Sequence, residues 1–163
     1  MIDVLAVAID AYALNIKELS ETVPTSEVIE RYLVGADEDL LAQLHPLVLS
    51  LPDVAHLLRL MILDHEELLE DRALAAAALN YFIMPFDAIP DTDAGIVGVL
   101  DDAYVMFALI QKMQSPSTAL TTWMESQQLA IAMLQNIFPT WLNQYLEQWL
   151  GAVQLNHPTK SEE

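Results

Sequence analysis

Apolar residues recur at three- and four-residue spacing along most of the chain, which is the pattern of amphipathic helices. The first run covers residues 2–19, where Leu5, Ile9, Tyr12 and Ile16 share one face. Comparable runs, separated by proline, glycine or capping residues, predict further helices over residues 26–34, 36–51, 51–63, 65–84, 96–113, 116–137 and 139–153.

Proline and capping residues between these runs predict where each helix begins and ends. Pro46 should kink or end the third helix, because proline lacks the backbone N–H that a helix interior uses. Ser50 is then the expected N-cap of the fourth helix, and Ser115 that of the helix beginning at Pro116. Thr25 is the expected cap of the second helix.

Composition agrees with an all-α protein. The chain has 163 residues, only four glycines and no cysteine. This length fits one domain, and the scarcity of glycine argues against a strand-and-turn architecture. We therefore expect a single helical domain over residues 1–155, with about six to eight helices and a polar tail at 156–163.

The charge of the chain limits the kinds of molecule that it can bind. The formal net charge is −18. Most of it lies in residues 1–102, which hold 20 of the 24 acidic residues and only four basic residues. Such a surface repels nucleic acid phosphates and anionic lipid and attracts a basic partner or divalent cations. No positively charged leader is apparent. The uncharged window 126–146 carries four glutamines, two asparagines and Pro139, so we interpret it as amphipathic rather than membrane-spanning. We expect a cytoplasmic protein that does not bind nucleic acid, with contact to a membrane surface as the less favoured alternative.

The stretch YFIMPFDAIPDTDAGIVGVLDDAYV, residues 81–105, places five aspartates in the most apolar part of the chain. It resembles the core motif of the YkvA-like domain, a bacterial domain of unknown function. The matching positions are Tyr81, Pro85, Asp87, Pro90, Asp91, Gly98, Asp101 and Asp102, with Arg72 where the family often has a basic residue. The resemblance covers residues 72–112 and implies a central helical hairpin but no established activity.

Two interpretations of these aspartates remain open. In the first, Asp87 and Asp91 latch the loop between the two helices by capping backbone amides. One of Asp101 and Asp102 then faces the loop, and the other faces solvent or Arg72. In the second, Asp87, Asp91, Asp93, Asp101 and Asp102 supply oxygen ligands for magnesium or calcium.

A second acidic run, residues 63–71, lacks the repeated Glu-x-x-His motif of a di-iron bundle. We interpret it as a solvated helix N-terminus. No nucleophile, base and phosphate-binding loop occur together as a catalytic motif.

The C-terminal third carries an aromatic stripe. Phe138, Trp141, Tyr145 and Trp149 are three, four and four residues apart, so one helix face presents four rings. We expect these rings to be partly buried and to contact a partner, although packing on the core is the simpler alternative. The sequence thus favours a non-catalytic interaction or adaptor protein that binds a basic protein or a second copy of itself. The alternative is a divalent-metal-binding protein or a metal-dependent hydrolase.

Overall fold

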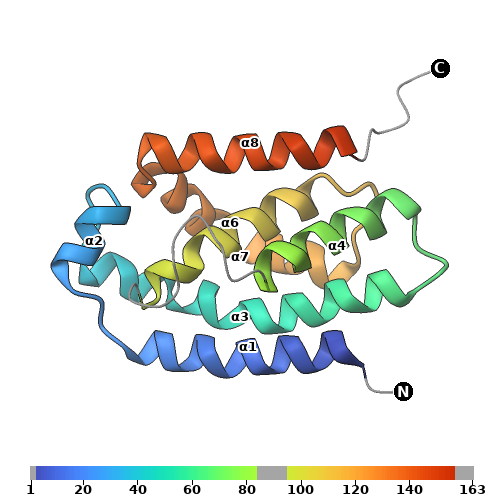
Figure 1. The fold of residues 1–163 in the computed structure, drawn as a ribbon, viewed down its shortest axis with the longest axis horizontal. Coiled ribbons are helices and arrows are strands. Elements are labelled where there is room, and N and C mark those ends of the chain that lie inside the picture. Colours follow the sequence, from blue (N-terminus) through green and yellow to red (C-terminus); the bar gives the residue numbers. More distant parts are fainter. Residues whose placement is uncertain (1–2, 84–94, 157–163) are drawn as a thin grey trace.

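The computed structural model describes residues 3–83 and 95–156, with the side chains of 154–156 left out. Within this part, the chain forms seven helices and no strand (Figure 1). They are α1 (Val4–Glu21), α2 (Ser26–Tyr32), α3 (Glu38–Leu63), α4 (Leu69–Ile83), α6 (Val97–Gln111), α7 (Thr118–Ile137) and α8 (Thr140–Asn156). The expected all-α bundle is confirmed.

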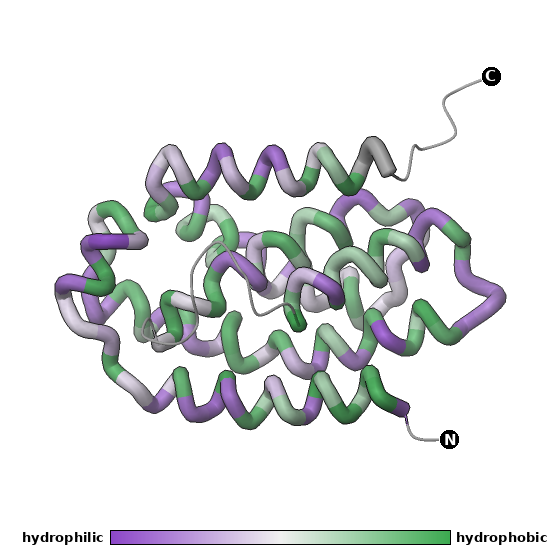
Figure 2. The backbone as a smooth tube through the Cα atoms, in the orientation of Figure 1, coloured by the Kyte–Doolittle hydropathy of each residue, from purple (hydrophilic) through white to green (hydrophobic). Residues whose placement is uncertain are grey.

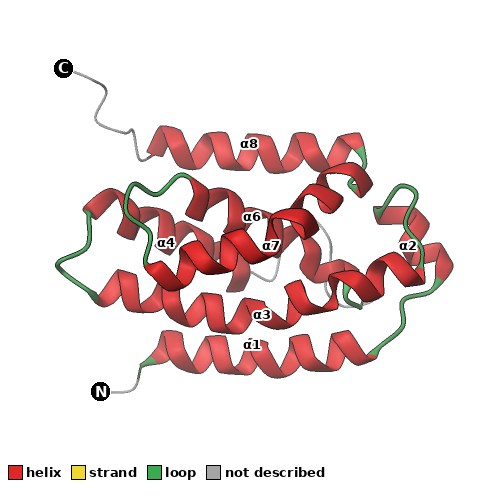
Figure 3. Ribbon diagram, turned by 180° about the vertical axis from the view of Figure 1, so that it is seen from behind, coloured by secondary structure: helices red, strands yellow, loops and turns green. Residues whose placement is uncertain are grey.

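Two helices form the centre of the bundle. The long helix α3 contacts α1, α4, α6 and α7. Helix α6 is buried on nearly every side, as expected for a helix that is hydrophobic all round. Seen from the front and from behind, α1 and α8 lie along opposite sides of this centre (Figures 1 and 3).

Helix α3 corrects the sequence prediction. The chain does not break between Pro46 and Ser50, because one helix of 26 residues contains both Pro46 and Pro52. Each proline removes one backbone hydrogen bond, but the helix buries nine side chains against its neighbours, and that burial outweighs the loss. Ser50 is not an N-cap. Its hydroxyl donates to the Leu47 carbonyl at 2.6 Å and accepts from the Trp123 indole N–H at 2.8 Å.

Other helix ends follow local capping. The side chains of Asp3, Thr25, Asp37 and Ser117 each accept a hydrogen bond from a backbone amide of the following first turn. The predicted cap at Thr25 is confirmed. The predicted cap at Ser115 is wrong, because α7 begins two residues later and Ser117 caps it.

One helix also has the length and composition of a membrane span. Among the described helices, α3 alone meets these criteria. The buried core helix of a bundle meets them as well, and α3 has this position in the fold.

Candidate functional site

Helices α4 and α6 form an antiparallel hairpin whose two ends are fixed by long-range hydrogen bonds. Near the start of α4, the Asp71 carboxylate accepts from the amides of Gln114 and Ser115, both at 2.9 Å. Towards the end of α4, the Tyr81 hydroxyl donates to Asp101 Oδ2 at 2.7 Å. Early residues of α4 thus meet the region after α6, and late residues meet its beginning. The hairpin predicted over residues 72–84 and 96–113 is confirmed in its packing.

Both aspartates of the Asp101–Asp102 pair are fully buried. Tyr81 of α4 donates to Asp101, while Tyr12 of α1 donates to Asp102 Oδ2 at 3.1 Å. The expectation that one of the two faces solvent or Arg72 is therefore wrong. Adjacent residues of a helix point about 100° apart, but α6 has helices on several sides, so both directions lead into the protein.

Arg72 has a different role from the one expected. Its guanidinium donates two hydrogen bonds, of 3.1 Å from Nε and 2.7 Å from a terminal nitrogen, to the carbonyl oxygen of Ile62. This carbonyl belongs to the last turn of α3, where helix carbonyls lack a partner within the helix. Arg72 therefore ties the start of α4 to the end of α3.

The predicted cation site is only partly within the described residues. Asp87, Asp91 and Asp93, and with them the predicted latch by Asp87 and Asp91, lie outside. Within residues 3–83 and 95–156, no three side chains of histidine, aspartate or glutamate are grouped so that they could hold a metal ion. A magnesium or calcium site that includes Asp101 and Asp102 stays a prediction.

Asp71 is the site residue that sequence reasoning missed. The sequence predicts a solvated helix N-terminus for the acidic run at 63–71, yet Asp71 is fully buried and accepts hydrogen bonds from two backbone amides. Its neighbour Glu70 accepts a hydrogen bond from the Gln114 side-chain amide at 3.2 Å. The partners lie more than 40 residues further along the chain, so no local spacing could reveal them. The prediction of a solvated run holds for His65 and Glu66, which are exposed.

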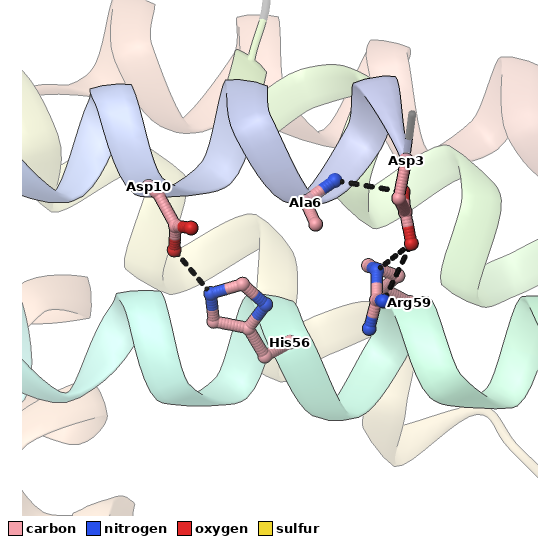
Figure 4. A network of polar contacts seen from close by, with 5 residues as sticks. All are labelled: Asp3, Ala6, Asp10, His56 and Arg59. Atoms are coloured by element: carbon pink, nitrogen blue, oxygen red, sulfur yellow. Dashed lines mark hydrogen bonds and ion pairs between the residues drawn. The ribbon is translucent and has the colours of Figure 1, made fainter. Parts of the chain in front are cut away.

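Polar contacts also join α1 to α3 (Figure 4). The Arg59 guanidinium donates to Asp3 at 2.8 Å, and His56 lies 2.8 Å from Asp10. The Asp3 carboxylate accepts a further bond from the amide of Ala6. The hydrogen bond from Arg59, followed by that from Ala6, lowers the pKa of Asp3 below its usual 3.8.

Helix α8 has one buried and one partly exposed face. Leu142, Leu146, Leu150 and Val153 are buried at a spacing of four, four and three residues. The flanking face carries Trp141 and Tyr145, which are 46% and 43% exposed, and the partly buried Trp149.

Three aromatic residues of the stripe, Phe138, Trp141 and Trp149, each have a ring neighbour from another part of the bundle. The centroid distances are 6.5 Å for Trp141 and Tyr32, 4.8 Å for Trp149 and Tyr81, and 5.8 Å for Phe138 and Tyr104. Phe138 is only 4% exposed, so the expectation that all four rings are partly buried is wrong for Phe138. It precedes α8 and belongs to the core. Trp149 connects the stripe to the hairpin, because it packs on the tyrosine that binds Asp101.

An acidic hollow of about 400 Å³ lies between α2 and the start of α3. Glu30, Asp37, Glu38 and Asp39 line it, together with the apolar Ile29 and Ala36. Helix α2 also carries Tyr32, the ring neighbour of Trp141. Helix α2 thus carries both Glu30, which lines the acidic hollow, and Tyr32, which neighbours Trp141.

Residues 71–108 match the model of a family described as "Protein of unknown function (DUF1232)". The match covers the hairpin segment and less than a quarter of the chain. The match confirms the resemblance on which the hairpin was predicted, and the DUF1232 segment runs from Asp71 through α4 into α6. Neither a curated protein nor a solved structure matches the chain. The buried Asp71, Tyr81, Asp101 and Asp102 all fall within the DUF1232 segment, whereas the exposed rings of α8 do not.

Proposed function

We propose that this protein is a non-catalytic interaction protein that binds a basic partner protein through the exposed aromatic face of α8. The observation that carries the proposal is the exposure of Trp141 and Tyr145, one helical turn apart on the same face. Aromatic side chains are the commonest anchors of protein–protein interfaces, since they bury much area with few rotatable bonds.

The buried face of α8 supports this assignment. Leu142, Leu146 and Leu150 hold the helix on the bundle, so Trp141 and Tyr145 are presented by an anchored element. A partner that covers them would lose little free energy to ordering this part of the surface. These leucines hold α8 on the bundle without burial of Trp141 or Tyr145.

The charge of the molecule indicates the kind of partner. Trp141 lies beside Tyr32 of α2, and α2 contributes Glu30 to the acidic hollow. A lysine or arginine next to an apolar anchor of the partner could therefore reach carboxylates while the anchor covers Trp141. Guanidinium groups also stack favourably on aromatic rings. The net charge of −18 disfavours a second copy as the partner.

Capture by the immobilised protein tests the proposal. Wild type is compared with W141A/Y145A and with L129A, which removes a 76% exposed leucine from α7 as a matched control. Circular dichroism should show the same helicity for all three. We expect wild type and L129A to retain the same protein from an extract of the native cell, W141A/Y145A to lose it, and sodium chloride to release it. Equal retention by all three chains would contradict the proposal. Retention of the same chain alone would identify self-association instead.

A further inference from the structure

A small apolar hollow lies at the end of the bundle where α3 turns into α4. Its volume is about 140 Å³, and the residues that line it are Leu57, Leu60, Met61, Asp64, Glu67 and Ser117. Pockets for drug-sized ligands usually measure about 300–1,000 Å³. This hollow therefore suits a single side chain better than a free small molecule.

Exposed leucines lie close in sequence to the residues that line the hollow. Leu60, which lines it, is 55% exposed, and Leu63 is equally exposed. Leu68 and Leu69 directly follow the lining residue Glu67 and are 45% and 77% exposed. Single exposed leucines are ordinary, but four exposed leucines lie within ten residues here, and clustered exposed apolar side chains are typical of interaction sites.

Acidic side chains accompany the leucines. Residues 63–72 include five acids and one arginine. That arginine, Arg72, directs its guanidinium at the Ile62 carbonyl. Figure 2 shows this turn as a hydrophilic segment interrupted by hydrophobic positions. The lining of the hollow thus combines the apolar Leu57, Leu60 and Met61 with two carboxylate residues, Asp64 and Glu67.

Hydrogen bonds within the α3–α4 turn, and to Asp71 at the start of α4, hold the turn in place. Asp64 Oδ1 accepts from the Glu66 amide at 2.9 Å, and the Glu67 amide donates to the Asp64 carbonyl at 3.2 Å. Buried Asp71 fixes the neighbouring turn through Gln114 and Ser115, just before the start of α7. A surface ordered in advance loses less free energy when it binds.

We infer that this surface is a second docking site, which takes a basic amphipathic segment of a partner protein. An aliphatic side chain of the segment would fill the hollow, and lysine or arginine residues beside it would meet the carboxylates of Glu66 and Glu67. Charge complementarity selects this occupant. A second copy would set the same carboxylates against each other, and an anionic membrane would be repelled by them.

The site is separate from the aromatic face of α8. The α3–α4 turn lies at one end of the bundle, and α2 with the start of α8 lies at the other (Figure 1). Binding at the leucine turn should therefore be independent of Trp141 and Tyr145. Loss of binding at one of these surfaces therefore says nothing against binding at the other.

A designed peptide tests the inference directly. The probe is a helix-forming peptide of about 14 residues in which leucine and lysine alternate with helical periodicity. One control peptide has glutamate at every lysine, and a second has the same composition in shuffled order. Binding is measured by isothermal titration calorimetry with the full chain, at low and at high sodium chloride.

Four variants locate the binding. L60S/L69S removes two exposed leucines of the turn, and L14S/L129S removes two leucines of similar exposure elsewhere. E66Q/E67Q removes two charges at the turn, and E18Q/E21Q removes two exposed charges from α1. We expect L60S/L69S to weaken binding of the leucine–lysine peptide by about tenfold or more. E66Q/E67Q should weaken it several-fold at low salt, and each matched control should leave it unchanged.

Three results would overturn the inference. The first is failure of the leucine–lysine peptide to bind, or equal binding of the glutamate or shuffled peptide. The second is equal weakening by the turn variants and their matched controls, which would indicate general attraction to an acidic protein. The third is loss of peptide binding in W141A/Y145A with the turn variants unaffected, which would place the peptide on α8 and support the proposed function alone.

Discussion

The Tyr81 hydroxyl donates a 2.7 Å hydrogen bond to the carboxylate of Asp101, and both side chains are buried between α4 and α6. The two residues are 20 positions apart, on the two arms of the hairpin that matches the DUF1232 family. Trp149 of α8 packs edge-on against the same tyrosine, at a centroid distance of 4.8 Å. The family segment thus carries a polar contact within the core, and α8 lies directly over it.

Removing this donor should destabilise the fold. Tyr81→Phe deletes the hydroxyl that binds Asp101 and leaves the ring in place. Loss of a partner for a buried acceptor costs about 1–3 kcal/mol, so the free energy of unfolding should fall by that amount in urea denaturation. Tyr145→Phe is the matched control, because its ring is 43% exposed, and it should change stability little. Equal stability of Tyr81→Phe and wild type would show that the hydrogen bond contributes nothing net.

Asp71 should be more important to stability than its position in an acidic run indicates. Asp71→Ala would strip the amides of Gln114 and Ser115 of their shared acceptor, and we expect a loss of about 1–3 kcal/mol. Glu66→Ala, an exposed neighbour in the same run, should stay within about 0.5 kcal/mol of wild type. Thermal denaturation of the two variants under identical conditions checks the difference. Similar melting temperatures would show that the hydrogen bonds from Gln114 and Ser115 to Asp71 contribute nothing net.

The hairpin, the all-α class and the aromatic face of α8 could be predicted because each depends on local spacing. Periodicity located the helices, and a motif of fixed spacing located the hairpin. The continuity of α3 could not be predicted, because Pro46 and Pro52 are local signals against a helix. The burial of Leu47, Val48 and Leu51 on other helices overrides those signals.

The burial of polar side chains could not be predicted either, because it depends on contacts between distant parts of the chain. The acceptor role of Asp71 and the burial of Asp101 with Asp102 depend on residues brought close only by the fold. Sequence spacing shows that two aspartates are adjacent but not that helices cover both. Phe138 was assigned to the α8 stripe by spacing alone, whereas it precedes the helix and packs on Tyr104.

Glycine substitutions should separate backbone strain from helix propensity. Gly95 has a φ of +57°, and an added Cβ would lie 3.2 Å from the Thr22 carbonyl oxygen. Gly35 has a φ of +69° but open space around it, and Gly151 lies within α8 with nothing near. We expect Gly95→Ala to lose the most stability, Gly35→Ala to lose about 1–2 kcal/mol, and Gly151→Ala to gain about 0.5–1 kcal/mol. Chemical denaturation of the three variants gives the order, and a stabilised Gly95→Ala would refute it.

The contact between Asp3 and Arg59 should depend on pH. The hydrogen bond from Arg59 lowers the pKa of Asp3 in the folded chain below 3.8, the value expected when unfolded. The stabilisation is therefore complete above pH 3.8 and is lost as the pH falls through the lower, folded pKa. Asp3→Asn keeps a capping side chain but removes the charge. Wild type should be the more stable chain at about pH 6, and the difference should shrink below pH 3.8. A difference that stays constant at lower pH would contradict the ion pair.

Site-specific photo-crosslinking in the native cell tests the proposed function most directly. Benzoylphenylalanine replaces Tyr145 on the exposed face of α8 in one chain and Leu129 on α7 in the other; these side chains are 43% and 76% exposed. We predict that illumination yields an adduct with one basic protein at position 145 and none at position 129. The adduct at position 145 should disappear when Trp141→Ala is added. No adduct at position 145, or the same adduct at both positions, would contradict the assignment of this face as the binding surface.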